Sequence, residues 1–178
     1  MNKIEAIAKS IFDLDDSVIS RSGGAHRISL QSVIDRSNFP DQLPVSTDNL
    51  ADLIDHTLLK PEATEEQVIK ICQEAETYHF RSVCVNPANA SLAKKHLPHV
   101  DLCCVIGFPL GANSTEIKVA EASRAIADGA AEIDMVINLG ALKSQNHDLV
   151  YNEILQIAAI CHDRKAILKV IIETCLLN

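Results

Sequence analysis

From residue 48 onward, short apolar runs alternate with longer stretches in which apolar residues recur at helical spacing. The apolar runs cover residues 50–59, 81–85, 100–108, 131–139 and 166–173. They are rich in Val and Ile and are bounded by Gly, Pro or Asn, which is typical of strands. Both faces of the runs are largely apolar, as expected for strands that helices cover.

Helix signals lie between the apolar runs. Thr64 and Gln67 form a capping box before an amphipathic stretch. The other expected helices are a short one from Pro87 to Leu97 with Asn86 as its cap, one that starts at Asn113 and Glu116 and stops at Gly129, and one over residues 147–162. This regular alternation predicts a parallel sheet with right-handed crossovers.

Five strands allow two α/β architectures. One is a complete flavodoxin-like doubly wound sheet. The other is about five of the eight β/α units of a (β/α)8 TIM barrel, which typically has ~250 residues. The sequence stops at Asn178, directly after the fifth apolar run, where a doubly wound domain would normally add a covering helix. This favours the barrel, and we expect a chain truncated after its fifth strand.

Residues 1–47 have a different texture. Ile4, Ile7, Ile11 and Leu14 predict one amphipathic helix. Residues 20–24 and 39–44 are rich in helix-breaking residues and indicate loop or linker. We therefore expect an N-terminal helical arm and linker over 1–47, and the barrel segment over 48–178.

Composition narrows the classes of function. The chain is 47% hydrophobic and 22% charged, with a net charge of −8 and only 3% aromatic residues. These values disfavour a disordered chain and a nucleic-acid partner. No apolar run approaches the ~18–20 residues that span a bilayer, so we expect no membrane partner. The acidic N-terminus is unlike a secretory signal, and six cysteines are then expected as reduced thiols in the cytoplasm.

Two charged residues interrupt the apolar runs. Asp134 lies in the fourth run and Lys169 in the fifth. Burying an isolated charge is costly unless it is paired or neutralised. A buried Lys–Asp ion pair without chemical function would account for both residues. Alternatively, desolvation lowers the pKa of the lysine, whose neutral amine then attacks a carbonyl to form a Schiff base while the carboxylate moves protons.

Five motifs occur in order at the ends of the expected strands. They are residues 53–59 (LIDHTLL), 82–87 (SVCVNP), 105–111 (VIGFPLG), 132–138 (EIDMVIN) and 168–174 (LKVIIET). Together they resemble the deoxyribose-phosphate aldolase family, which consists of class I aldolases on a (β/α)8 barrel. The resemblance covers roughly residues 48–178.

The resemblance implies the site residues and the chemistry. Lys169 is implied to be the Schiff-base lysine and Asp134 the proton-relay acid, with Asp55 and Cys84 near the bound substrate. The family cleaves 2-deoxyribose 5-phosphate, a sugar phosphate of deoxyribonucleotide and carbohydrate catabolism, to glyceraldehyde 3-phosphate and acetaldehyde. No metal and no other cofactor are expected, and a homodimer or larger assembly is suggested.

The sequence also departs from the family. The second lysine, which lowers the pKa of the first, and the stretches that hold the phosphate would follow residue 178. We therefore expect little or no aldolase activity and poor stability from residues 1–178 alone. Two other interpretations stay open at this point. One is a non-catalytic truncated remnant, and the other is a complete flavodoxin-like binding domain.

Overall fold

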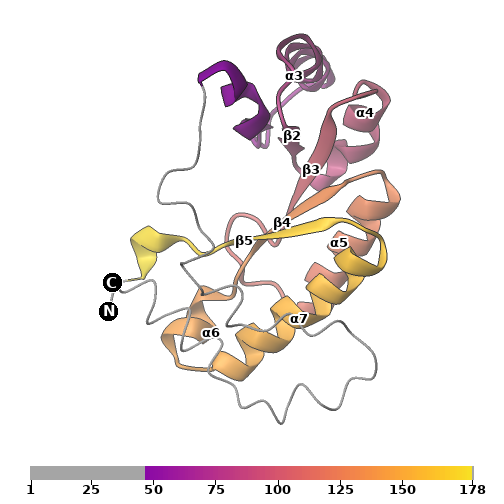
Figure 1. Cartoon of the computed structure of the whole chain (residues 1–178). Coiled ribbons are helices and arrows are strands. Elements are labelled where there is room, and N and C mark those ends of the chain that lie inside the picture. The colour runs from indigo at the N-terminus through magenta and orange to yellow at the C-terminus, as the bar shows by residue number, and fades with distance from the viewer. Residues whose placement is uncertain (1–46, 178) are drawn as a thin grey trace. The chain divides into compact units, whose positions relative to one another are not determined.

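The computed structural model describes residues 47–177, nearly all of which belong to the second of two units of the chain, Asp48–Asn178. Strands and helices alternate along this part, as the pattern predicts (Figure 1). The strands are β1 (Asp55–Leu58), β2 (Ser82–Val85), β3 (Asp101–Ile106), β4 (Glu132–Val136) and β5 (Ile167–Ile171). The α-helices are α3 (Glu65–Tyr78), α4 (Ala90–Lys95), α5 (Thr115–Ala127), α6 (Leu139–Lys143) and α7 (His147–Asp163). The helix expected around Ile4 to Leu14 lies outside the described residues.

The strand order separates the two expected architectures. The five strands form one parallel sheet in the order β1-β2-β3-β4-β5. A flavodoxin-like sheet has the order 2-1-3-4-5 and helices on both faces, so the flavodoxin-like alternative is wrong. When each strand joins the sheet beside its predecessor in one direction, every right-handed crossover puts its helix on the same face. Figure 1 shows α3, α4, α5 and α7 following one another along one side of the sheet, which is the arrangement of (β/α)8 barrel units.

The two faces of the sheet have different side chains. The outer face packs against the helices and is fully buried at Val83, Val85, Leu102, Cys104, Ile133 and Met135. Because side chains alternate along a strand, the opposite face carries Asp55, Cys84, Asp134 and Lys169. Asp134 and Lys169 are also paired in register between β4 and β5. The polar residues that the sequence singled out therefore share the face that the helices do not cover.

The first apolar run is only partly a strand. Residues 50–53 belong to a 3₁₀ helix, Thr47–Leu53, instead of to the strand expected over 50–59. Strand pairing begins at Asp55, opposite Ser82. Before that point the backbone turns, and the Ile54 N–H donates to the Ala51 carbonyl over 3.1 Å. Apolar character alone did not distinguish this turn from an extended strand.

The helix starts agree only partly with the sequence signals. The capping box of Thr64 and Gln67 is confirmed at the start of α3. Asn86 precedes the 3₁₀ turn Pro87–Asn89, but its side chain makes no capping bond and donates to the Leu59 carbonyl over 3.2 Å. The N-cap of α5 is Ser114, one residue after the expected Asn113. Within residues 47–177, no helix is long and apolar enough to cross a membrane.

A buried ion pair joins two helices behind β4. Lys118 of α5 and Glu153 of α7 are both fully buried, and Nζ of Lys118 lies 2.8 Å from Oε2 of Glu153. The same ammonium donates to the carbonyl of Val136 over 2.8 Å. This lysine therefore ties both helices to the end of the strand that carries Asp134.

Candidate active site

Lys169 is the centre of a cluster of carboxylates on the inner face of the sheet. Its Nζ lies 2.7 Å from Oδ2 of Asp55, 3.0 Å from Oε2 of Glu132 and 3.2 Å from Oδ1 of Asp134. These three acids come from β1 and β4, so the curvature of the sheet brings its first and fifth strands to the same site. The Lys169 side chain is 34% exposed, and solvent therefore has access to the amine.

Further polar side chains hold two of these carboxylates. Ser82 donates to Oδ1 of Asp55 over 2.6 Å. Arg81 lies 2.8 Å from Oε1 of Glu132 and 3.0 Å from Oδ2 of Asp101. The Glu132 side chain is only 4% exposed. Its burial is compensated by ion pairs with two cations, Arg81 and Lys169.

The carboxylates keep Lys169 protonated. Burial alone lowers the pKa of its ammonium, but the hydrogen bonds to Asp55 and Glu132 and the negative charge of Asp134 outweigh it. The pKa of Lys169 therefore lies above its ordinary value. For Asp55 the directions are reversed. Burial alone raises the pKa of its carboxyl group, but the hydrogen bonds from Lys169 and Ser82 bring this pKa below its usual range. The sequence-based expectation that desolvation lowers the pKa of Lys169 is therefore wrong for the described residues, because it left out the neighbouring carboxylates.

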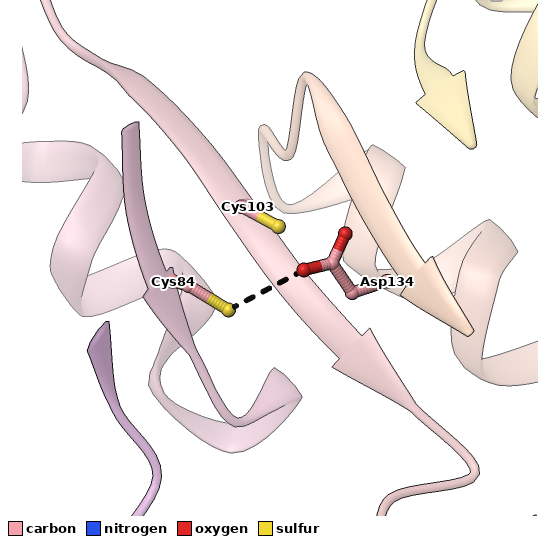
Figure 2. Close-up of side chains that lie close together, drawn as sticks. All are labelled: Cys84, Cys103 and Asp134. Atoms are coloured by element: carbon pink, nitrogen blue, oxygen red, sulfur yellow. Dashed lines mark hydrogen bonds between the residues drawn. The ribbon is translucent and has the colours of Figure 1, made fainter. Parts of the chain in front are cut away.

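Asp134 also faces two cysteines. Figure 2 shows that Cys84 of β2, Cys103 of β3 and Asp134 of β4 point toward one another. The Cys84 thiol donates to Oδ2 of Asp134 over 4.0 Å. Oδ1 of Asp134 is buried and accepts no hydrogen bond among the described residues. Its 3.2 Å contact with Lys169 is near enough for electrostatic attraction but lacks the direction of a hydrogen bond.

All four residues singled out in the sequence meet at this cluster: Lys169 contacts Asp55 and Asp134, and Asp134 contacts Cys84. His56, the neighbour of Asp55, points away and bonds Glu74 of α3 over 2.8 Å. Neighbouring residues of a strand face opposite sides of the sheet, so His56 cannot join Asp55 at the cluster. Glu173 stands four residues after Lys169, but it follows the end of β5 and its Oε2 lies 3.9 Å from Sγ of Cys175.

Sequence reasoning missed Glu132 and Ser82 as members of the cluster. The signal was present, because Glu132 stands two residues before Asp134 and Ser82 two residues before Cys84. Residues at that spacing share a strand face. A lysine amine, flanking carboxylates and solvent access are groups that imine chemistry uses, in which a neutral amine adds to a carbonyl and a carboxylate moves protons.

Comparison with known families adds an independent finding. Residues 50–178 match the model of the family described as DeoC/LacD family aldolase. A deoxyribose-phosphate aldolase of Treponema denticola is 56% identical over 127 residues, which cover 70% of this chain and 59% of that protein. A deoxyribose-phosphate aldolase of Thermococcus kodakarensis is 53% identical over 133 residues, which cover 72% of this chain and 59% of that protein.

Solved structures agree with these matches. The tetrameric deoxyribose phosphate aldolase of Aeropyrum pernix superposes with a TM-score of 0.66 at 39% identity, covering 75% of this chain and 56% of that one. The described part of the chain is thus an α/β fold of the TIM-barrel class with five β/α units. The chain spans about 59% of the length of the curated relatives that it matches.

Proposed function

Because the chain belongs to the DeoC/LacD family of aldolases, we propose that its segment 48–178 carries the imine-forming half of an aldolase site for 2-deoxyribose 5-phosphate. The single observation that supports this most strongly is the position of Lys169. Its amine is partly open to solvent and surrounded by three carboxylates at the inner face of barrel strands. The named relatives are deoxyribose-phosphate aldolases, which fits a lysine at this place.

The proposed reaction assigns one step to each group. The neutral amine of Lys169 adds to the aldehyde carbon C1 of the open-chain sugar, and loss of water gives an iminium ion. Asp134, directly or through one water, takes the proton of the C3 hydroxyl. The C2–C3 bond then breaks, glyceraldehyde 3-phosphate leaves, and its bonding electrons form an enamine. Protonation at C2 and hydrolysis release acetaldehyde and restore the amine.

Asp55 and Cys84 lie at the same site as Lys169 and Asp134, and we assign them positioning roles only. Asp55 holds Nζ of Lys169 at 2.7 Å, so it orients the amine before attack. Cys84 touches the far oxygen of Asp134 and thereby fixes the rotation of that carboxylate. We assign both residues to the edge of the substrate site, without a covalent step.

The raised pKa of Lys169 favours a second candidate for the isolated chain. An amine that stays protonated attacks carbonyls slowly, and the chain covers only 59% of the length of its relatives. Residues 1–178 by themselves are therefore proposed to have little aldolase activity, as a non-catalytic remnant would. The two candidates differ in whether the segment works once the remaining barrel units are supplied.

A chimera separates these candidates. Residues 48–178 replace the matching segment of the Treponema denticola relative, and acetaldehyde release from 2-deoxyribose 5-phosphate is measured. We expect turnover that falls by several orders of magnitude in Lys169→Arg, as for loss of a covalent nucleophile. The matched control Lys95→Arg, on the exposed end of α4, should keep it. A folded but inactive chimera would support the remnant, and unchanged turnover in Lys169→Arg would exclude the proposed lysine.

The thiols and the relatives support a proposal for the compartment and the assembly of the protein. All six cysteines are free, five of them buried, which supports a reducing compartment such as the cytoplasm. The Aeropyrum pernix structure is tetrameric, and we propose assembly as a homodimer or larger for the barrel to which this segment belongs. The proposed role is deoxyribonucleotide and carbohydrate catabolism, with a sugar phosphate as the partner.

A further inference from the structure

We propose that Cys84, Cys103 and Asp134 form a binding site for a soft divalent metal ion such as Cd²⁺ or Zn²⁺, and that the bound ion blocks the site. The three side chains come from adjacent strands and converge on one point (Figure 2). Their two sulfur atoms and one carboxylate oxygen all lie within 4.8 Å of one another. This goes beyond the proposed function, in which no metal takes part.

The distances fit tetrahedral coordination after small rotations. Zinc binds thiolate sulfur at ~2.3 Å and carboxylate oxygen at ~2.0–2.2 Å. Two such ligands at a tetrahedral angle are ~3.5–3.8 Å apart, about 1 Å less than the largest separation present here. Cys84 and Cys103 are direct partners in the β2–β3 register, so rotation about each Cα–Cβ bond moves the sulfur atoms without displacing the backbone.

One carboxylate oxygen, which lies against Lys169 but accepts no hydrogen bond within residues 47–177, can become a ligand. Oδ1 of Asp134 is buried and accepts no hydrogen bond among the described residues. Asp134 can also leave Lys169 without stranding the ammonium, because Asp55 and Glu132 are nearer to Nζ, at 2.7 and 3.0 Å. The ion would therefore take an oxygen whose contact with Lys169 the two nearer carboxylates can replace.

The charge balance also favours a cation. The ion-paired network contains four carboxylates, Asp55, Asp101, Glu132 and Asp134, and two cations, Arg81 and Lys169. Its excess of negative charge attracts a divalent ion. Binding releases the two thiol protons to solvent, so the incoming charge of +2 is cancelled by two thiolates. Thiolate ligands select soft ions such as Zn²⁺ and Cd²⁺ over Mg²⁺ and Ca²⁺.

Binding has a consequence for the proposed reaction. A metal ion on Asp134 removes the carboxylate that would take the proton from substrate, so micromolar Cd²⁺ should inhibit any turnover. This inhibition of turnover rests on the proposed function. The site itself does not, because its test measures binding directly.

The test is a Cd²⁺ titration of the reduced 178-residue chain, followed by ultraviolet sulfur-to-cadmium charge-transfer absorption and by calorimetry. A Cys175→Ala background removes the one exposed thiol. We expect one ion per chain, two thiolates in the absorption, and affinity that rises with pH as protons leave. Cys103→Ala should halve the absorption and weaken binding at least ~10-fold, a loss that even an outer partner of a metal ligand brings.

The matched control is Cys104→Ala, an adjacent and equally buried cysteine on the opposite face of β3. It should leave absorption and affinity unchanged. If Cys103→Ala fails to fold, the Asp134→Asn variant tests the site instead. It should keep the absorption of both thiolates and bind Cd²⁺ with lower affinity. Saturation without thiolate absorption, or equal loss in Cys104→Ala and Cys103→Ala, would overturn the proposal. Imine trapping at Lys169 without metal is unaffected by either outcome, so a failed metal site and a failed aldolase site remain distinguishable.

Discussion

Removing one carboxylate beside Lys169 should lower the pKa of the lysine. Glu132→Gln keeps the shape of the side chain but deletes a negative charge 3.0 Å from Nζ. At this distance Coulomb's law gives ~1.4 kcal/mol in a water-like dielectric and severalfold more in protein. Because the Lys169 side chain is 34% exposed, we take the water-like value as the lower bound. It corresponds to a fall of about one pKa unit and to ~10-fold more neutral amine at a given pH.

Reductive ethylation measures this shift. The purified chain is incubated with acetaldehyde and cyanoborohydride over a range of alkaline pH, and labelling of Lys169 is followed by peptide mass spectrometry. The Glu132→Gln profile should move to lower pH by at least about one unit. Asp101→Asn is the control, because Asp101 pairs with Arg81 at 3.0 Å. An unmoved Glu132→Gln profile, or an equal shift in Asp101→Asn, would refute the reasoning.

Three further predictions concern the relay acid, a buried ion pair and acid stability. Asp134→Asn in the active chimera should reduce turnover by ~10²–10⁴-fold while the imine stays trappable by borohydride, and loss of trapping in a folded variant would place the acid in imine formation instead. Lys118→Met should cost ~3–5 kcal/mol in urea unfolding, because it leaves Glu153 buried without its cation, and the double variant with Glu153→Leu should recover most of that loss. The pKa of Asp55 is lower in the folded chain than in the unfolded chain. Its ionised carboxylate therefore stabilises the fold above the unfolded pKa of ~3.9, and this stabilisation is lost as the pH falls through the folded pKa. Asp55→Asn should therefore flatten the acid limb of the unfolding midpoint against pH, and an unaltered limb would contradict the assignment.

The sequence predicted the sheet well because strand burial leaves a direct signature. The Val- and Ile-rich runs became β2 to β5 with ends shifted by a few residues. The strand order was not readable, since the same alternation fits a doubly wound sheet and a barrel. Leu50 to Leu53 show the limit of apolar character, because a 3₁₀ turn and a strand bury the same residue types.

The sequence predicted which residues meet at the site, but it did not predict how their charges set the pKa of Lys169. Asp134 and Lys169 stood out because a lone charge in an apolar strand requires a reason. Glu132 did not stand out, since it lies at the start of its run, where a charge is common. The pKa of Lys169 depends on Glu132 as well as on Asp55, which lies 114 residues away along the chain. Only the folded sheet shows that these acids outweigh desolvation.

Lys169 is proposed to form a covalent imine with the sugar phosphate. The most direct measurement is borohydride reduction of the 178-residue chain in the presence of 2-deoxyribose 5-phosphate at alkaline pH, followed by peptide mapping. We expect a reduced adduct on the β5 peptide at Lys169, absent from Lys169→Arg and retained in Lys95→Arg. An adduct spread over exposed lysines and missing from Lys169, or the same adduct in Lys169→Arg, would contradict it.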